Sequence, residues 1–186
     1  MANRVLTLPQ ALAALAGRGL AAITIDIKDG PPFGTDGFAR AVLHTVAAAR
    51  CSECIIWAKA DEVVSDLLDA GGGLTAGFVL MNQTADARAH GMHRLNRLPG
   101  AAAVAAHWGM VDAALVAAAR ARGLRVYGWT ANEEHMADAI ISAGAFAVVT
   151  DKVRSNVRIR CVALTPRPLQ PTMVQQRMDA IRAACS

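Results

Sequence analysis

The chain of 186 residues suits a single domain with a substantial core. Hydrophobic residues make up 54% of the sequence but aromatic residues only 4%, so the core must consist mainly of Ala, Val, Leu and Ile. Charged residues or Gly interrupt the apolar runs well before the roughly 18 residues that a membrane-spanning helix needs, so the sequence predicts no transmembrane segment.

The net charge of +4 is unevenly distributed. Residues 152–186 carry seven Lys and Arg against Asp179 alone, a local balance of +6, so the remainder is mildly acidic. We therefore expect a body over residues 1–153 and a basic, proline-containing extension over residues 154–186.

The N-terminal segment, MANRVLTLPQALAALAGRG, is rich in Ala and Leu and contains Arg but no acid. It resembles a mitochondrial presequence, but we interpret it as the first helix of the fold and leave the organelle unassigned. Cys51 and Cys54 form a C-x-x-C without the second ligand pair that zinc needs, so we expect structural thiols in an intracellular protein.

One unit recurs along the chain: a helix, a glycine, and an apolar strand that ends in polar residues. Its instances are ALAALAGRG before LAAITIDIK, DEVVSDLLDAGGG before LTAGFVLMNQ, VDAALVAAARARG before LRVYGWTAN, and ADAIISAG before AFAVVTDK. CIIWAKADE adds a strand after a helix over about residues 36–50 that lacks the glycine, and residues 101–107 form a weaker candidate strand.

Strands that alternate with helices indicate parallel strands joined by right-handed crossovers, in an open sheet or a (β/α) barrel. No G-x-G-x-x-G follows the first strand, which argues against a dinucleotide-binding fold. Polar residues at the strand exits should converge on one face, where barrel enzymes carry their chemistry. These are Asp26, Lys28, Lys59, Asn82, Thr130, Asn132 and Asp151. The sequence predicts a partial TIM-type barrel of about five or six strands.

Three stretches resemble the glycerophosphodiester phosphodiesterase family. Residues 129–132, W-T-A-N, precede a helix and a strand that ends in Thr150-Asp151, as in the C-terminal part of that family's barrel. TLPQAL at residues 7–12 and ITIDIK at residues 23–28 are similar to two earlier family motifs. The resemblance covers roughly residues 6–153 and implies a (β/α)8 barrel that hydrolyses glycerophosphodiesters with Mg²⁺ or Ca²⁺.

In that family one histidine lies in an H-R-G motif and another in an H-D motif, while a Glu-x-Asp pair and the Glu of E-i-K hold the metal. This sequence has neither histidine motif at the required place, and the Glu-x-Asp pair would precede residue 1. Asp26 stands where the family's metal-binding Glu would be, and Lys28 matches its Lys. Trp57-Ala58 replaces the family's S-F. We expect that the front of the barrel is missing, and that a metal is bound only if the chain is active.

Several residues remain open to two interpretations. Asp26 is a candidate metal ligand or an acid paired with Lys28, and Trp129 either caps a ligand pocket or fills space left by missing strands. Lys28, Asn132 and Asp151 are further pocket candidates, with Asp151 more simply capping a turn. His107 is expected to be a hydrogen-bonded structural imidazole. The run RAHGMHRLNR over residues 88–97 is expected to be a surface loop, or else an anion-binding patch.

In the extension, Arg154, Arg158 and Arg160 alternate with apolar residues and could bind an acidic protein face or RNA. A helix over residues 173–185, with Met178 and Ile181 on its apolar stripe, either folds back on the body or docks on a partner.

The leading interpretation is a truncated, catalytically inactive phosphodiesterase-like half-barrel that serves as a subunit of a larger assembly. The alternative is part of an active phosphodiesterase, acting in lipid metabolism, whose catalytic groups come from missing sequence or another chain. A small-molecule binding module that uses the strand-exit face is the third.

Overall fold

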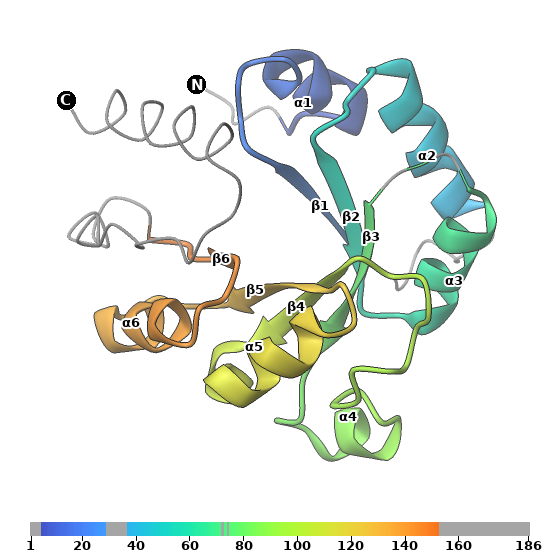
Figure 1. Ribbon diagram of the computed structural model, residues 1–186. Helices are drawn as coiled ribbons and strands as arrows, with labels where there is room; N and C mark the ends of the chain where they lie inside the picture. Colours follow the sequence, from blue (N-terminus) through green and yellow to red (C-terminus); the bar gives the residue numbers. More distant parts are fainter. Residues whose placement is uncertain (1–4, 29–36, 72, 74, 153–186) are drawn as a thin grey trace, which may run out of the picture. The chain divides into compact units, whose positions relative to one another are not determined.

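The computed structural model describes residues 5–28, 37–71, 73 and 75–152 (Figure 1). The chain divides into two units, and the first, Met1–Asn156, contains every described residue. The extension, with Arg154, Arg158, Arg160 and the helix expected around Met178 and Ile181, lies outside the described residues. Its boundary at residue 153 and its partner-binding role therefore stay predictions.

Helices and strands alternate along the described chain, as the recurring unit predicts. In chain order they are α1 Leu8–Leu15, β1 Ile23–Ile27, α2 Phe38–Ala48, β2 Cys54–Ala58, α3 Asp61–Asp69, β3 Thr75–Leu80, α4 Ala85–Ala89, β4 Ala103–His107, the short 3-10 helix η1 Trp108–Met110, α5 Ala113–Arg120, β5 Arg125–Trp129, α6 Glu134–Ser142 and β6 Ala147–Val148. The first helix and the weak strand expected at residues 101–107 are both confirmed.

The six strands form one parallel sheet in the order β1-β2-β3-β4-β5-β6. The sheet is curved, and α1, α2, α3, α5 and α6 lie along its outer side (Figure 1). This arrangement is a half-barrel of the α/β class and confirms the predicted partial barrel. Among the described residues, β1 and β6 are the two edges of the sheet.

Helix ends explain where the chain can turn back toward the next strand. Gly144 follows α6 with a φ of 78°, a left-handed conformation that glycine adopts without steric cost. The helix predicted to lack a closing glycine is α2, and there Arg50 takes the left-handed conformation with a φ of 51°. Such a φ is uncommon for a residue with a side chain.

The two faces of the sheet carry different cores. The larger core lies between the strands and the outer helices and includes Ile56, Phe78, Val104 and Ile140, all of them 1% exposed or less. A smaller cluster on the inner face is built from the strand residues that alternate with those of the larger core, among them Ile55, Trp57, Val79, Ala105 and Tyr127. Because side chains alternate along a strand, residues of this second set point to the interior of the half-barrel.

Two local expectations are wrong. Cys51 and Cys54 are not free thiols but form a disulfide, because the turn between α2 and β2 brings their Cα atoms to 5.4 Å. Strand β6 covers only Ala147–Val148 and not the whole apolar run AFAVVT, because only two of its residues align with β5.

The run over residues 88–97 is not a plain surface loop. Met92 is 6% exposed and belongs to the inner cluster, so this segment covers part of the interior. The guanidinium of Arg97 donates from Nε to Asp61 Oδ1 at 2.9 Å and from Nη2 to the Val79 carbonyl at 2.8 Å, with its side chain only 9% exposed. Arg97 therefore fastens this segment to the start of α3 and to β3, and is not available to a free anion.

None of the helices in the described part of the chain has the length and apolar character needed to span a bilayer.

Candidate ligand site at the strand exits

A hollow of about 420 Å³ lies at the carboxyl ends of the strands. It is bordered by residues from all six described strands or their exits: Asp26, Lys28, Trp57, Lys59, Val79, Met81, Ala105, Trp129, Thr130, Val149 and Asp151. Its walls combine two indole rings with two acids and two lysines. A hollow of this composition suits a small ligand that has an apolar part and a charged part.

Successive side chains of a strand point to opposite faces of the sheet, and this alternation explains why these side chains meet. In β1, Ile23 and Ile27 are buried on the helix side, so Asp26 and then Lys28 point to the inner face. Register pairs Asp26 with Trp57, and Lys59 follows Trp57 at the same parity. The inner-face positions of neighbouring parallel strands thus deliver alternate residues to one end of the half-barrel.

One ion pair is formed at the hollow. Lys28 Nζ lies 2.7 Å from Asp26 Oδ2, with 78% and 41% of the two side chains exposed, so the pair is a solvated one of modest strength. The salt-bridged interpretation of Asp26 is therefore what the described residues show. Lys59 and Asp151 also border the hollow, which balances its formal charge at two positive and two negative groups.

Trp129 has defined contacts on two sides. Its indole Nε1–H donates a hydrogen bond of 2.8 Å to the Ala105 carbonyl of the adjacent strand. The ring of His107 meets it edge to face, with centroids 5.4 Å apart and planes at 89°. Trp129 therefore forms a fixed wall of the hollow, so both uses foreseen for it, pocket wall and space filler, are compatible with its place.

His107 is hydrogen-bonded, as expected of a structural imidazole. Its Nδ1 accepts from the backbone N–H of Gly109 at 3.2 Å, which places the proton of the neutral ring on Nε2. Burial lowers the pKa of His107, so the neutral form is favoured further. The imidazole is thus held as a neutral ring beside Trp129.

Asn132 joins the exits of β5 and β6. Its Oδ1 accepts from the Asp151 backbone N–H at 2.9 Å and from the Thr150 hydroxyl at 3.3 Å, while its Nδ2 donates to Asp151 Oδ2 at 3.0 Å. The W-T-A-N and T-D segments are therefore bonded to each other. Asn132 positions Asp151 at the edge of the hollow but is not itself one of the bordering residues.

The structure brings together five of the seven polar strand-exit residues: Asp26, Lys28, Lys59, Thr130 and Asp151. Asn132 contacts the hollow through Asp151, whereas Asn82 bonds Gln83 and the Arg88 guanidinium instead. Sequence reasoning placed Lys59 among the converging strand-exit residues but named neither Lys59 nor Trp57 as a ligand-pocket candidate. Both residues lie at the exit of the next strand, on the same face of the sheet as Asp26 and Lys28, and this alternation is the signal that could have found them.

The described residues do not fit a divalent metal on their own. No three His, Cys, Asp or Glu side chains come together in the described part of the chain as ligands of one ion. Asp26, the residue considered as a metal ligand, has its carboxylate engaged by Lys28. Hard cations such as Mg²⁺ and Ca²⁺ need several oxygen ligands, which this set does not supply alone.

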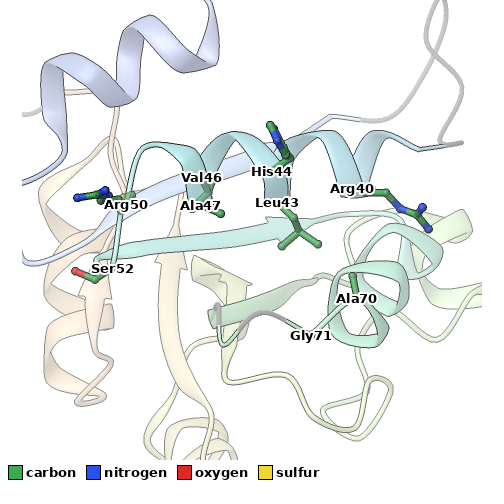
Figure 2. Close-up of a pocket in the computed structure, with 10 residues that line it drawn as sticks. Arg40, Leu43, His44, Val46, Ala47, Arg50, Ser52, Ala70 and Gly71 are labelled. Carbon is green, nitrogen blue, oxygen red and sulfur yellow. The ribbon is translucent and has the colours of Figure 1, made fainter.

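A larger hollow of about 710 Å³ lies on the outer side, between α2 and the end of α3 (Figure 2). Arg40 and Arg50 lie at opposite ends of α2, and His44 lies between them along the helix (Figure 2). Because these basic groups do not converge, this hollow lacks the concentrated charge of an anion site. We place the candidate site at the strand exits, where charged side chains from several strands meet.

Residues 73–155 match the model of the glycerophosphoryl diester phosphodiesterase family. They include both segments that Asn132 joins. This part of the chain is similar to that family. Among curated proteins, the chain is 28% identical over 183 residues to the Arabidopsis thaliana glycerophosphodiester phosphodiesterase GDPD4, a match that covers 98% of this chain and 49% of that protein.

Solved structures show the same fold. A Silicibacter pomeroyi protein of the glycerophosphoryl diester phosphodiesterase type matches with a TM-score of 0.61 and 19% identity, over 77% of this chain and 52% of the other. A Parabacteroides distasonis glycerophosphodiester phosphodiesterase matches with a TM-score of 0.53 and 12% identity, over 73% and 55%. The chain therefore spans about half the length of the family members it matches.

Proposed function

We propose that this chain is a phosphodiesterase-type half-barrel that does not hydrolyse phosphodiesters alone and acts as a subunit of a larger assembly. The observation that carries the proposal is the Asp26–Lys28 pair at 2.7 Å. It occupies the carboxylate that the family resemblance assigns to the metal. The hollow can thus attract a charged ligand, but its described side chains do not assemble a metal centre.

Proton transfer is the second requirement of such a reaction. Positioned acid and base groups typically contribute about 10²–10⁴-fold in rate. His107 is the imidazole beside Trp129, and its Nδ1 is bonded to Gly109 while burial favours the neutral ring. A single imidazole in this setting does not supply an acid and a base on opposite sides of a phosphorus atom.

A second candidate function is half of an active enzyme whose remaining groups come from other sequence. The observation that favours it is that Lys28, Lys59, Trp129 and Asp151 still border one hollow. Paired lysines suit a phosphate group, and indole faces suit the organic part of a diester. In this case the chain would contribute binding groups, and its complement would contribute the chemistry.

The proposed inactivity of the chain alone is tested by assaying the purified full chain with glycerophosphocholine and with bis(p-nitrophenyl) phosphate, each with Mg²⁺, Ca²⁺ or EDTA. We expect no product above that of a Lys28→Ala variant in any condition. Metal-dependent turnover that falls in Asp26→Ala would overturn the proposal. Binding of glycerophosphate without turnover, weakened by Lys59→Ala, would support a hollow that recognises the ligand but does not react with it.

A further inference from the structure

The disulfide between Cys51 and Cys54 closes a very short loop. The two residues are three positions apart, and the bond joins the turn after α2 to the first residue of β2. The stability that a disulfide provides by restricting the unfolded chain grows with the length of the loop, so a loop this short provides little. The C-x-x-C spacing is also the one at which cysteine pairs exchange between thiol and disulfide in redox proteins. The bond is therefore better suited to reversible reduction than to permanent cross-linking.

The disulfide is the principal connection across its turn. The backbone N–H of Cys54 lies 3.5 Å from the Cys51 carbonyl oxygen, beyond the range of roughly 2.7–3.2 Å that is usual for such bonds. The preceding residue, Arg50, has a φ of 51°, a left-handed conformation that a residue with a side chain keeps only where its surroundings hold it. Breaking the S–S bond thus removes the main restraint on this turn.

A small reductant can approach the disulfide from the outer side of the sheet. Cys51 borders the outer hollow of about 710 Å³, together with its neighbours Arg50 and Ser52 (Figure 2). Cys54 does not belong to the described residues that border this hollow, and the two cysteines are only 3% and 2% exposed. An attacking thiolate therefore reaches the Cys51 sulfur through the hollow, and a hollow of this volume admits a small dithiol.

Glu53, which lies inside the loop, holds the segment that joins α1 to β1. Its Oε1 accepts a hydrogen bond of 2.7 Å from the backbone N–H of Gly17, and its carbonyl oxygen accepts one of 3.0 Å from the backbone N–H of Ile23. Gly17 follows α1, and Ile23 is the first residue of β1. These two bonds fix the segment between α1 and β1 against the start of β2, the one strand that pairs with β1 in the described part of the chain.

We propose that Cys51 and Cys54 form a site of thiol–disulfide exchange for a dithiol, and that the redox state of the pair controls how firmly the segment between α1 and β1 is held. One thiolate of the dithiol attacks the Cys51 sulfur, and the electron pair of the broken S–S bond goes to the Cys54 sulfur, which takes a proton. The second thiol of the reductant then attacks the first, which releases the Cys51 sulfur as a thiol and leaves the reductant as a disulfide. Two electrons and two protons pass to the protein, and the loop around Glu53 is freed.

The first test is reduction of the folded chain. The full chain is used with Cys161→Ser and Cys185→Ser, which leave Cys51 and Cys54 as its only cysteines, and is equilibrated with mixtures of reduced and oxidised dithiothreitol. We expect two thiols to appear, counted by mass after alkylation, and to disappear when the oxidised reagent is restored. Near-UV circular dichroism shows whether the chain stays folded at each step. A disulfide that resists excess dithiothreitol until the chain unfolds would overturn the proposal.

Amide hydrogen exchange, measured by NMR in both redox states, shows what the pair controls. Reduction should speed exchange at Gly17 and Ile23 at least tenfold more than at Arg125. The Arg125 N–H is the reference because it is bonded to the Ala102 carbonyl at 3.0 Å, at the start of β5. Equal acceleration at all three amides would indicate a general loss of stability, and the proposed control of the segment before β1 would then be wrong.

Two variants assign the effect to this loop. Cys51→Ala combined with Cys54→Ala should give fast exchange at both amides, with reduced or oxidised dithiothreitol alike. A response to the reagent that persists in this variant, or exchange as slow as in the oxidised chain, would contradict the proposal. Glu53→Ala removes the carboxylate but keeps the backbone carbonyl, so in the oxidised chain it should speed exchange at Gly17 and leave Ile23 protected. Unchanged exchange at Gly17 would remove Glu53 from the proposed coupling. The dithiothreitol series on the intact loop needs neither variant, so it decides the question even if the double variant does not fold.

Discussion

The indole N–H of Trp129 donates a hydrogen bond of 2.8 Å to the carbonyl oxygen of Ala105. This bond connects β5 to β4 through a side chain, at the height where the strand-exit hollow begins. Trp129 also borders the hollow, and the His107 ring packs against its indole in an edge-to-face arrangement. The Trp129 indole thus forms part of the wall of the candidate site and also links β4 to β5.

Replacing Trp129 by Phe should lower the free energy of unfolding by about 1 kcal/mol or somewhat more, since a net hydrogen bond contributes about 0.5–1.5 kcal/mol. Urea denaturation measures the change. Trp108→Phe is the matched control, because Trp108 contacts His107 and His135 through its ring. An equal loss in both variants would mean that ring volume, and not the bond to Ala105, explains the effect.

Asn132 offers a test based on charge. Asn132→Asp keeps the oxygen that accepts from the Asp151 backbone but replaces the Nδ2 donor with a second carboxylate beside Asp151. We expect this variant to be less stable than Asn132→Ala at pH 8 and to recover below about pH 4, where carboxylates protonate. Thermal melts at both pH values measure this. A pH-independent difference would contradict the predicted repulsion.

Gly77 in β3 has no room for a side chain. A Cβ atom there would lie 2.8 Å from the Ala103 carbonyl oxygen and 2.9 Å from the Ala103 Cβ, both on the adjacent strand. Gly77→Ala should therefore cost about 1–3 kcal/mol, the usual range for overpacking. Gly109→Ala is the control, because its nearest neighbour, His107 Nδ1, would be 3.4 Å away. Similar denaturation midpoints for the two variants would refute the clash.

Two groups predict how stability depends on pH. The hydrogen bond from the Gly17 backbone N–H lowers the pKa of Glu53 below its ordinary 4.5, so its contribution is present above that pH and is lost as the pH falls through the lowered value. Burial lowers the pKa of His107 below 6.5, so its neutral form favours the folded state above that pH, and stability declines as the pH falls below it.

Melting temperatures between pH 3 and 8 separate the two groups. Glu53→Gln should flatten the acid end of the profile, and His107→Gln should remove the decline that begins near pH 6.5. His93→Gln, at an exposed histidine, should leave the profile unchanged. A decline near pH 6.5 that persists in His107→Gln would assign it to another group.

The alternation of helix and strand could be predicted from sequence because each unit is local. Apolar periodicity and closing glycines located every strand, including the weak one that became β4. The convergence of Asp26, Lys28 and Asp151 followed from strand direction alone, since parallel strands end at the same side. The family motif marked Trp129 and Asn132, and the Asn132 bonds to Thr150 and Asp151 explain why these segments occur together.

Contacts between segments that are distant in the chain could not be predicted from the sequence. Arg97 and Asp61 are 36 residues apart in the chain, and nothing in either local pattern indicates their pairing at 2.7 Å. The Cys51–Cys54 bond depends on how α2 meets β2, and the short β6 on how far β5 aligns with it. These features are decided by tertiary geometry, which local propensity does not determine.

Strand order in the sheet is identical to strand order in the chain. Each strand is therefore held by its immediate predecessor and successor, and no pairing between described strands spans an intervening one. A whole strand-helix step added or removed at either end would leave the interior ladders intact. The number of strands in such a sheet can consequently change by whole strand-helix units, and the pairing of the remaining strands stays the same.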